Sequence, residues 1–333
     1  MVKSREKTTV SFVVSGIVLL VLCLLSLRLG AADMSWHEFF DAVSDVYRKT
    51  PGGVIIYSVR LPRMLSGVVA GMGLGISGAV IQALTGNKMA SPNLLGVNAG
   101  AGFGVILLLY CFPSLFALVP FSALAGAFLS TLFIATVSGK IGMTRGTVIL
   151  VGLAFSSILS SGISLMSLLD ADVLVSYNAF SIGSLSGVML SDLYIPLALI
   201  VASFVVSLVI SDKLDILSLG DKVSLSLGVN VPLIRILSML VSSVCAAAAV
   251  SFAGLLGFVG LMSPHIARVF FPERSKYTII ASAVIGSMLV TLSDLIGRTL
   301  FAPSELPAGI FLSLVGAPFF LVLLVSGRGK HNA

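Results

Sequence analysis

The chain has 333 residues, of which 57% are hydrophobic and only 10% are charged, against roughly 25% charged in an average soluble domain. This composition, with a mean hydropathy of +1.11, excludes a soluble enzyme or a nucleic-acid-binding module. The net charge of +6 has to be interpreted by its distribution over membrane loops. The sequence predicts an all-α, polytopic membrane protein with a single transmembrane domain over residues 1–333.

Ten segments are apolar over about the 20 residues that a membrane-spanning helix needs. They are residues 10–29, 64–84, 94–112, 115–138, 147–169, 192–211, 231–252, 254–271, 278–297 and 306–325. The first run is longer than the apolar core of a signal peptide, roughly 7–15 residues. We therefore interpret it as a spanning helix, with cleavage after Ala31-Ala32 as the alternative.

Ten spans place both chain ends on the same side of the membrane. If that side is the cytoplasm, only six of the 20 Lys and Arg residues fall outside, namely Arg28, Arg48, Lys49, Arg60, Arg63 and Arg298. Because basic residues concentrate in cytoplasmic loops, we expect both termini to be cytoplasmic in the cell membrane.

Two segments outside the spans have distinct patterns. Residues 33–59 form an outer loop with an amphipathic helical pattern, typical of a helix that lies at the membrane interface. Its apolar side carries Trp36, Phe39, Phe40, Val43 and Tyr47. Residues 212–230 form the longest polar cytoplasmic stretch, predicted as two short helical pieces joined at Gly220-Asp221. A protein with so few water-facing residues has little use for such an insert unless a partner docks there.

The second span begins with the sequence RLPR, in which Pro62 fits the first turn of a helix. Beyond it, Gly67, Gly71, Gly75 and Ala79 recur every four residues on one face. In a membrane such a stripe of small residues lets a neighbouring helix backbone approach closely. We predict a buried, tightly packed helix with a charged outer end.

The motifs of common catalytic chemistry are absent from the sequence. No GxxxxGK[ST] segment is present to bind ATP phosphates and no HExxH segment to bind zinc. The three cysteines (Cys23, Cys111, Cys245) lie in apolar runs without CxxC spacing, as small core residues do. The acidic residues of the outer loop follow a helical spacing and are interpreted as a solvated face; they are Asp33, Glu38, Asp41 and Asp45.

Ionisable residues inside the spans are nearly missing, although ion-driven carriers usually need them. The main exception is Asp294, four residues before Arg298, where a local ion pair near the outer edge is the simplest interpretation. The chain therefore looks like a membrane gate that receives its energy from elsewhere. We expect no metal and no cofactor on this chain.

Three blocks of sequence carry a family resemblance. They are RLPRMLSGVVAGMGLGISGAVIQALTGNKMASPNLLGVNAGAGFGV from residue 60, GFVGLMSPHIAR over 257–268, and SDLIGRTLFAPSELPAGIFLSLVGAPFFLVLL over 293–324. In this order they resemble the signature of permease subunits of binding-protein-dependent ABC importers for iron–siderophore complexes, haem and cobalamin. The resemblance implies one half of a dimeric pore, working by alternating access.

The resemblance also implies partners and docking residues. Arg60, Arg63 and Arg298 would pair at the outer rim with glutamates of an extracytoplasmic substrate-binding protein, a chemistry that suits guanidinium groups; the alternative is that they anchor helix ends among lipid headgroups. The stretch LSLGDKVSLSLGV (217–229) resembles the family's coupling segment, which docks on ATP-binding cassette ATPase subunits. Its matching residues are Gly220, Asp221, Leu227 and Gly228.

A set of polar residues and a proline surrounds the turn after the second span. These residues either line the translocation pathway or satisfy backbone groups where the helix breaks, and both interpretations stay open; they are Gln82, Asn87, Pro92, Asn93 and Asn98. The family's usual N-P-L-A-[DE]-P is replaced here by NKMASP, with Lys88 and Ser91 as departures. His265, in a Pro-His pair, is interpreted as a structural residue.

The sequence thus indicates a non-enzymatic translocation subunit that moves a ferric siderophore into the cytoplasm, with ATP bound and hydrolysed on separate ATPase subunits. Haem and cobalamin are the alternative cargoes, and the second pore subunit is either another copy or a related permease. An ion-coupled secondary transporter is the main alternative mechanism, and an intramembrane enzyme is a more distant one because no paired nucleophile and base is evident.

Overall fold

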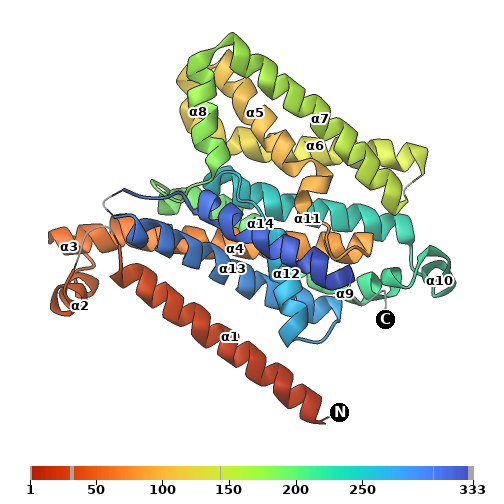
Figure 1. The fold of residues 1–333 in the computed structure, drawn as a ribbon, viewed down its shortest axis with the longest axis horizontal. Helices are drawn as coiled ribbons and strands as arrows, with labels where there is room; N and C mark the ends of the chain where they lie inside the picture. Colours follow the sequence, from red (N-terminus) through yellow and green to blue (C-terminus); the bar gives the residue numbers. More distant parts are fainter. Residues whose placement is uncertain (1, 31–33, 143, 303, 329–333) are drawn as a thin grey trace.

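The computed structural model describes residues 2–30, 34–142, 144–302 and 304–328, and throughout those ranges the regular structure is helical. The elements, shown in Figure 1, are α1 (Val2–Arg28), α2 (Trp36–Ser44), α3 (Pro51–Val54), η1 (Ile55–Arg60), α4 (Leu61–Thr85), η2 (Pro92–Leu95), α5 (Val97–Cys111), η3 (Pro113–Leu118), α6 (Val119–Ile141), α7 (Arg145–Leu169), α8 (Ala171–Ile182), η4 (Leu190–Leu193), α9 (Tyr194–Ser218), α10 (Asp221–Ser226), α11 (Val231–Ala253), α12 (Val259–Phe270), α13 (Ser275–Leu300) and α14 (Ala308–Arg328). The predicted all-α class is confirmed.

Seven of the described helices are long and apolar enough to cross a membrane. They contain α1, α4, α6, α7, α9, α11 and α13. Helix α5 and the described part of α14 are apolar but shorter. Polar side chains at the starts of several helices accept hydrogen bonds from otherwise unpaired backbone N–H groups, as capping requires. Asp170 does this for α8 and Asn230 for α11.

The segment predicted as a spanning helix over 254–271 is helical only from Val259. Residues 254–258 are extended or irregular, with Gly254 at φ +69° and Phe258 at φ +63°. A Cβ atom on Gly254 would lie 2.4 Å from the carbonyl oxygen of Phe180, so the chain passes the end of α8 too closely for any other residue. Apolar composition alone does not reveal this break.

Two further differences from the sequence prediction concern short elements. Helix α8 was not expected, because its 12 residues are too few to span a membrane. The outer loop is not one amphipathic helix: α2, α3 and the π-helical η1 follow one another, and η1 runs directly into α4. Of the predicted aromatic face, Phe39 is buried and the rest is exposed, namely Trp36, Phe40, Val43 and Tyr47. Asp33 lies outside the described residues.

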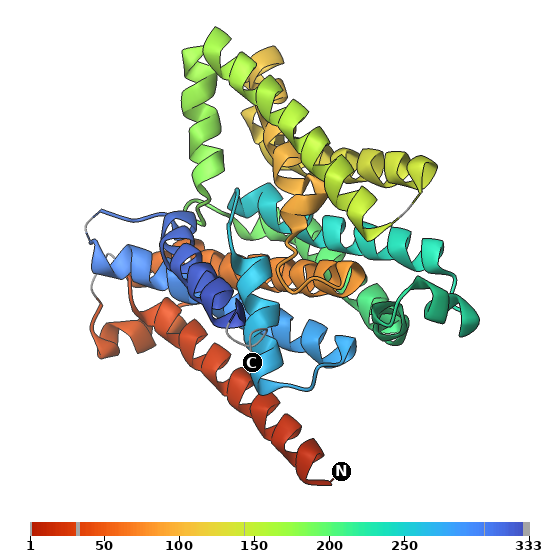
Figure 2. The same ribbon diagram turned by 45° about the vertical axis from the view of Figure 1, so that its right-hand side comes forward.

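The helices form two groups joined by α11. Figures 1 and 2 show α5, α6, α7 and α8 as a group set apart from α4, α9, α12, α13 and α14, with α1 crossing the far side of the second group. Helix α11 packs against α4 and α9 on one side and α6 on the other. The buried core follows this seam, and α4 is the most enclosed of the spanning helices.

The glycines of helix α4 allow it to pack closely at the centre of the helix bundle. A Cβ atom on Gly71 would lie 2.2 Å from the carbonyl oxygen of Gly286 on α13, and one on Gly75 would lie 2.0 Å from that of Ser282. Gly67 has more room, with Thr291 Oγ1 3.1 Å from a Cβ position. The small-residue stripe therefore faces α13, and the two backbones touch along this face.

Candidate functional site

Two polar clusters lie at opposite ends of α4, whose 25 residues give it a length of about 37 Å. We call them the arginine end, around Arg63, and the α10 end, around Gln82 and α10. Each gathers charged residues from segments that are distant in sequence.

At the arginine end, Arg63 joins α4 to α13. Its Nε lies 2.9 and 3.1 Å from the two carboxylate oxygens of Asp294, and its Nη1 lies 2.7 Å from Glu305 Oε2. Arg298 Nε approaches the same Asp294 at 3.4 Å. Asp294 thus lies between two guanidinium groups, and the expected local pair with Arg298 is present together with a longer-range pair.

The other two arginines, Arg60 and Arg298, both contact α1. Arg60 Nη1 donates to the carbonyl oxygens of Leu27 and Arg28, at 3.0 and 2.6 Å. Arg298 Nη2 donates to both the carbonyl and the hydroxyl oxygen of Ser26. The last turn of α1 is therefore held by two arginines, a favourable arrangement because carbonyl groups at a helix C-terminus attract positive charge.

All three predicted docking arginines are buried. Arg60 is 2% exposed, Arg63 6% and Arg298 3%, and each binds groups of its own chain. The structure therefore brings these residues together in one cluster, but as an internal network between α1, α4, α13 and the segment before α14. In this state they are not a free positive rim.

The α10 end contains the polar segment predicted between two spans. Gly220 and Gly228, which flank α10, have φ of +105° and +77°, values that favour glycine. Asp221 Oδ1 lies 2.6 Å from Arg235 Nη2 on α11, and the Ser224 hydroxyl donates to the carbonyl of Ile216 on α9. Helix α10 is thus fixed to the two helices beside it.

Four large apolar side chains of this segment are exposed. They are Leu219, Val223, Leu225 and Leu227, with exposed fractions from 44% to 63%. The segment follows the candidate membrane span that ends at Ser218. Exposed apolar side chains that gather outside a span are typical of a protein interface.

The turn between α4 and α5 lies at the same end and holds the predicted pathway residues. Gln82 is 2% exposed; it donates to the Ala90 carbonyl at 3.1 Å and accepts from Arg268 Nη2 at 2.6 Å. Asn87 accepts from the Met89 N–H at 2.9 Å. Pro92 is buried at the start of η2, Asn93 is exposed and Asn98 is half-buried. Gln82 and Asn87 therefore satisfy backbone groups of this turn.

A polar cavity of about 230 Å³ opens beside this turn. Lys88, a departure from the family pattern, forms an ion pair of 2.8 Å with Glu273 at its edge. The hydrogen bond and charge of Lys88 lower the pKa of the Glu273 carboxyl. Gln82–Arg268 links the last turn of α4 to α12, and Lys88–Glu273 links the α4–α5 turn to the α12–α13 connection. His265, on α12, has its ring 5.8 Å from that of Phe319 on α14.

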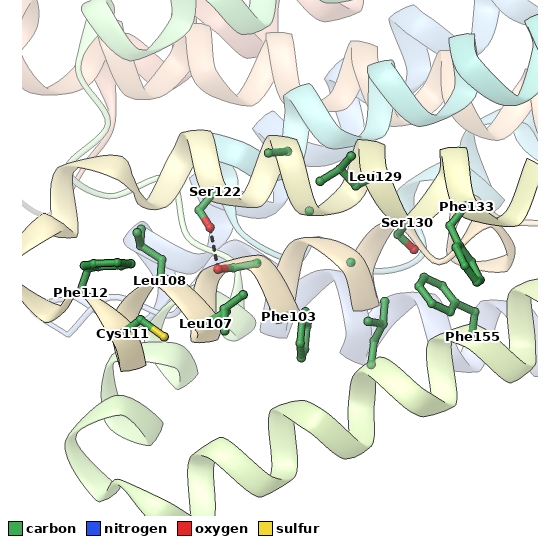
Figure 3. Close-up of a pocket in the computed structure, with 15 residues that line it drawn as sticks. Phe103, Leu107, Leu108, Cys111, Phe112, Ser122, Leu129, Ser130, Phe133 and Phe155 are labelled. Atoms are coloured by element: carbon green, nitrogen blue, oxygen red, sulfur yellow. Dashed lines mark hydrogen bonds between the residues drawn. The ribbon is translucent and has the colours of Figure 1, made fainter. Parts of the chain in front are cut away.

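A larger cavity of about 620 Å³ lies between α5, α6 and α7 (Figure 3). Its walls are apolar, with Phe103, Leu129 and the stacked rings of Phe133 and Phe155, whose centroids are 4.2 Å apart. The Ser122 hydroxyl donates to the Gly104 carbonyl at 2.6 Å. None of the described residues that line this cavity is charged, so its lining offers no ion pair to a charged metal complex.

The structure also draws attention to residues that the sequence analysis did not select. Helix α7 carries an exposed line of serines at positions 157, 160, 161 and 164, a spacing that puts them on one helix face. Their recurrence within an apolar span was the available signal. Phe258 was not identifiable in this way, because its positive φ and its close contact with Gly316 of α14 depend on the tertiary fold.

Among the described residues, no three His, Cys, Asp or Glu side chains gather as a metal site. The chemistry of both ends is instead that of hydrogen bonds and ion pairs between helices. Such groups suit docking and conformational change better than covalent catalysis.

Comparison with known proteins places this geometry in context. Residues 18–326 match the FecCD transport family. The Fe(3+)-citrate import system permease protein YfmD of Bacillus subtilis (strain 168) is 34% identical, over 98% of both chains. The hemin transport system permease protein HmuU of Yersinia pestis is 32% identical, over 95% of both. A solved inward-facing metal-chelate type ABC transporter has a TM-score of 0.83 at 26% identity, covering 96% of this chain and 99% of that one.

Proposed function

This chain belongs to the FecCD transport family, and we propose that it is the membrane-spanning permease subunit of an ABC importer that moves a ferric siderophore into the cytoplasm. The sequence contains no GxxxxGK[ST] segment, so we assign ATP binding and hydrolysis to separate ATPase subunits. Transport then follows alternating access, in which each partner prefers one of two gate states and so shifts their populations.

The observation that carries this proposal is the exposed apolar surface of α10. Val223 and Leu225 project from a short helix, and Leu227 from the residue directly after it. The Asp221–Arg235 pair holds this helix against α11. A force on α10 would pass directly into α9 and α11. We propose that this segment, including Gly220 and Gly228, docks in a groove of the ATPase subunit.

At the arginine end we propose docking of an extracytoplasmic substrate-binding protein on Arg60, Arg63 and Arg298. Guanidinium groups bind carboxylates through two parallel hydrogen bonds, and rim charges chiefly set the association rate and the register of docking. The burial of all three arginines means that docking requires some of their internal contacts to open.

We propose that the pathway lies between this chain and a second permease, identical or related. The serine line on α7 supports this arrangement because small residues on an exposed helix face let a neighbouring helix approach closely. The hydroxyls of Ser157, Ser161 and Ser164 already donate to carbonyls of α7 itself, so the small size of these residues, and not an unmet hydrogen bond, is the basis of the argument. Gln82, Asn87, Pro92, Asn93 and Asn98 would then shape its inner mouth.

The topology that we propose has ten crossings and cytoplasmic termini. Seven long apolar helices supply most of them, and α5, α12 with its extended leader 254–258, and α14 would supply the others. Irregular backbone at membrane depth is tolerated where protein encloses it, and the burial of Gly254 and Leu256 fits this condition.

The names of the relatives, which cite iron citrate and hemin, support the proposed cargo class. Ferric siderophore is our first proposal, and haem and cobalamin are the alternatives. All three cargoes are large complexes that carry their own metal ligands, so none needs a metal site in the permease.

The mechanism is tested by purifying the tagged chain from its source membrane in mild detergent. We expect an ATP-hydrolysing subunit to co-purify, and the Leu225→Glu variant to lose it. A chain that purifies without any ATPase, and that takes up cargo with a coupled flux of protons or sodium, would instead establish a secondary transporter.

A further inference from the structure

Arg63 is held between two carboxylates that differ greatly in exposure. Asp294, on its Nε side, is 3% exposed, whereas Glu305, on its Nη1 side, is 35% exposed. The side chain of Arg63 is 7% exposed. Glu305 is therefore the more exposed of the two carboxylates that contact the Arg63 guanidinium at the arginine end.

The two carboxylates differ in their ion-pair partners as well as in their exposure. Asp294 belongs to α13, where Arg63 and Arg298 both contact it. Glu305 lies in the connection between α13 and α14, and among the described residues its ion pair is the one with Arg63. Because its carboxylate is partly exposed, water can replace Arg63 as its partner, and it leaves Arg63 at a lower cost than the buried Asp294 does. Glu305 is therefore the contact of Arg63 that an incoming anion displaces first.

An incoming carboxylate can replace Glu305 without a change of charge at Arg63. If Glu305 swings away, Arg63 loses one of the two carboxylates that it contacts. A partner carboxylate can take its place without changing the charge of the cluster.

We propose that Glu305 is an internal competitor for the partner's carboxylate: it occupies Arg63 while the arginine end is undocked and is displaced when the substrate-binding protein docks. This inference rests on the docking role assigned above to Arg63. It adds a residue of this chain that sets the affinity of docking. The displacement of this residue also transmits docking to the helices beside it.

The displacement of Glu305 is transmitted to α14. Leu306, next to Glu305, donates its N–H to the Gly297 carbonyl at 3.0 Å, and Gly309 in the first turn of α14 donates to the Gly183 carbonyl at 3.0 Å. A Cβ atom on Gly309 would lie 2.0 Å from the Ile182 carbonyl oxygen. Movement of Glu305 therefore acts on a tightly packed contact between α8, α13 and α14.

The first experiment tests, without any partner protein present, whether Glu305 shields Arg63. The full chain in nanodiscs is treated with phenylglyoxal, which modifies accessible arginines, and modification of Arg63 is followed by mass spectrometry. We expect Glu305→Gln to raise the Arg63 rate severalfold. The matched control is Asp172→Asn, which removes an exposed carboxylate that has no ion pair within the described ranges; it should leave the rate unchanged.

The second experiment measures the affinity of the same variants for the substrate-binding protein that supports uptake with this permease. Glu305→Gln should bind about two- to fivefold more tightly, the range expected when one partly exposed ion pair no longer competes. Asp172→Asn should not, which separates competition from a general change in surface charge. In an Arg63→Gln background, which removes the cation that Glu305 pairs with, Glu305→Gln should have no further effect.

The outcomes distinguish this inference from the docking proposal. If Arg63→Lys weakens binding but Glu305→Gln leaves it unchanged or weakens it, docking stands and the competitor role of Glu305 is wrong. If neither substitution affects binding, the docking role of Arg63 fails and the inference fails with it. An unchanged Arg63 modification rate in Glu305→Gln overturns the inference without reference to any partner.

Discussion

Arg63 and Asp294 are 231 positions apart in the sequence, yet the Arg63 Nε lies within 3.1 Å of both carboxylate oxygens of Asp294. Both side chains are almost fully buried. This pair ties the first turn of α4 to the last turns of α13, where the two helices pack through glycines. It therefore belongs both to the fold and to the proposed docking cluster.

Replacing Asp294 by Asn should destabilise the protein. The substitution leaves Arg63 and Arg298 as buried charges with less compensation, which costs roughly 3–5 kcal/mol in comparable cases. The thermal unfolding midpoint of the purified chain should fall by several degrees, while Asp172→Asn should leave it unchanged. Equal midpoints for both variants would show that the buried pair contributes nothing to stability.

Gly71→Ala should also destabilise the protein, for a steric reason. The added Cβ atom would lie 2.2 Å from the Gly286 carbonyl oxygen and 2.5 Å from the Ser287 Cα, and overpacking of this kind costs about 1–3 kcal/mol. The matched control is Gly139→Ala on α6, where a Cβ atom meets nothing within 4 Å. That variant should be as stable as the parent or slightly more so. A Gly71→Ala protein that unfolds with the parent would contradict the close packing of α4 on α13.

Charge on the exposed face of α10 should uncouple transport without unfolding the permease. Leu225→Glu places a carboxylate on a side chain that is 59% exposed, so the unfolding midpoint should stay the same while ATPase co-purification and uptake are lost. Val46→Glu, at a residue that is 62% exposed in the outer loop, adds the same charge elsewhere and should retain both. Loss of activity in both variants would point to a general effect of charge.

The turn between α2 and α3 should loosen in acid. Hydrogen bonds from the Thr50 N–H, the Thr50 hydroxyl and the Lys49 N–H lower the pKa of the Asp45 carboxyl. Because the folded pKa is below the unfolded value of about 3.9, this stabilisation is present above about pH 4 and is lost as the pH falls through the folded pKa.

Hydrogen exchange of the Lys49 and Thr50 amides, corrected for the intrinsic exchange rate, measures this effect. Protection should decrease below about pH 4 in the parent and should be weak and independent of pH in Asp45→Asn. The same pH dependence in both proteins would assign the loosening to another group.

The sequence was sufficient for the helical class, because long apolar runs and a shortage of charge leave few other folds in a membrane. It also placed the polar segment at Gly220-Asp221, where hydropathy falls sharply between two spans. The break at 254–258 could not be predicted from the sequence, since it depends on the close passage of Gly254 by Phe180. Helix α8 was not predicted because it is too short to give a hydropathy signal.

The sequence was sufficient to identify the residues of the candidate site. It was not sufficient to predict their burial and their partners. RLPR, Asp294 and Arg298 were evident as a charged outer end, and their meeting depends on how α4 packs on α13. What the sequence could not reveal is that Arg60, Arg63 and Arg298 bind groups of their own chain. Glu305 stood within a recognised block, but its contact with Arg63 requires the fold of the connection before α14.

The most direct test of the central claim is uptake into proteoliposomes that contain this chain and its co-purifying ATPase subunit, with ATP inside or outside the vesicle. Labelled ferric siderophores, haem and cobalamin are each supplied with a substrate-binding protein. We predict accumulation of one ferric siderophore that requires hydrolysable ATP on the ATPase side and stops with Leu225→Glu. Accumulation that proceeds without ATP, driven by an ion gradient, would contradict the importer mechanism.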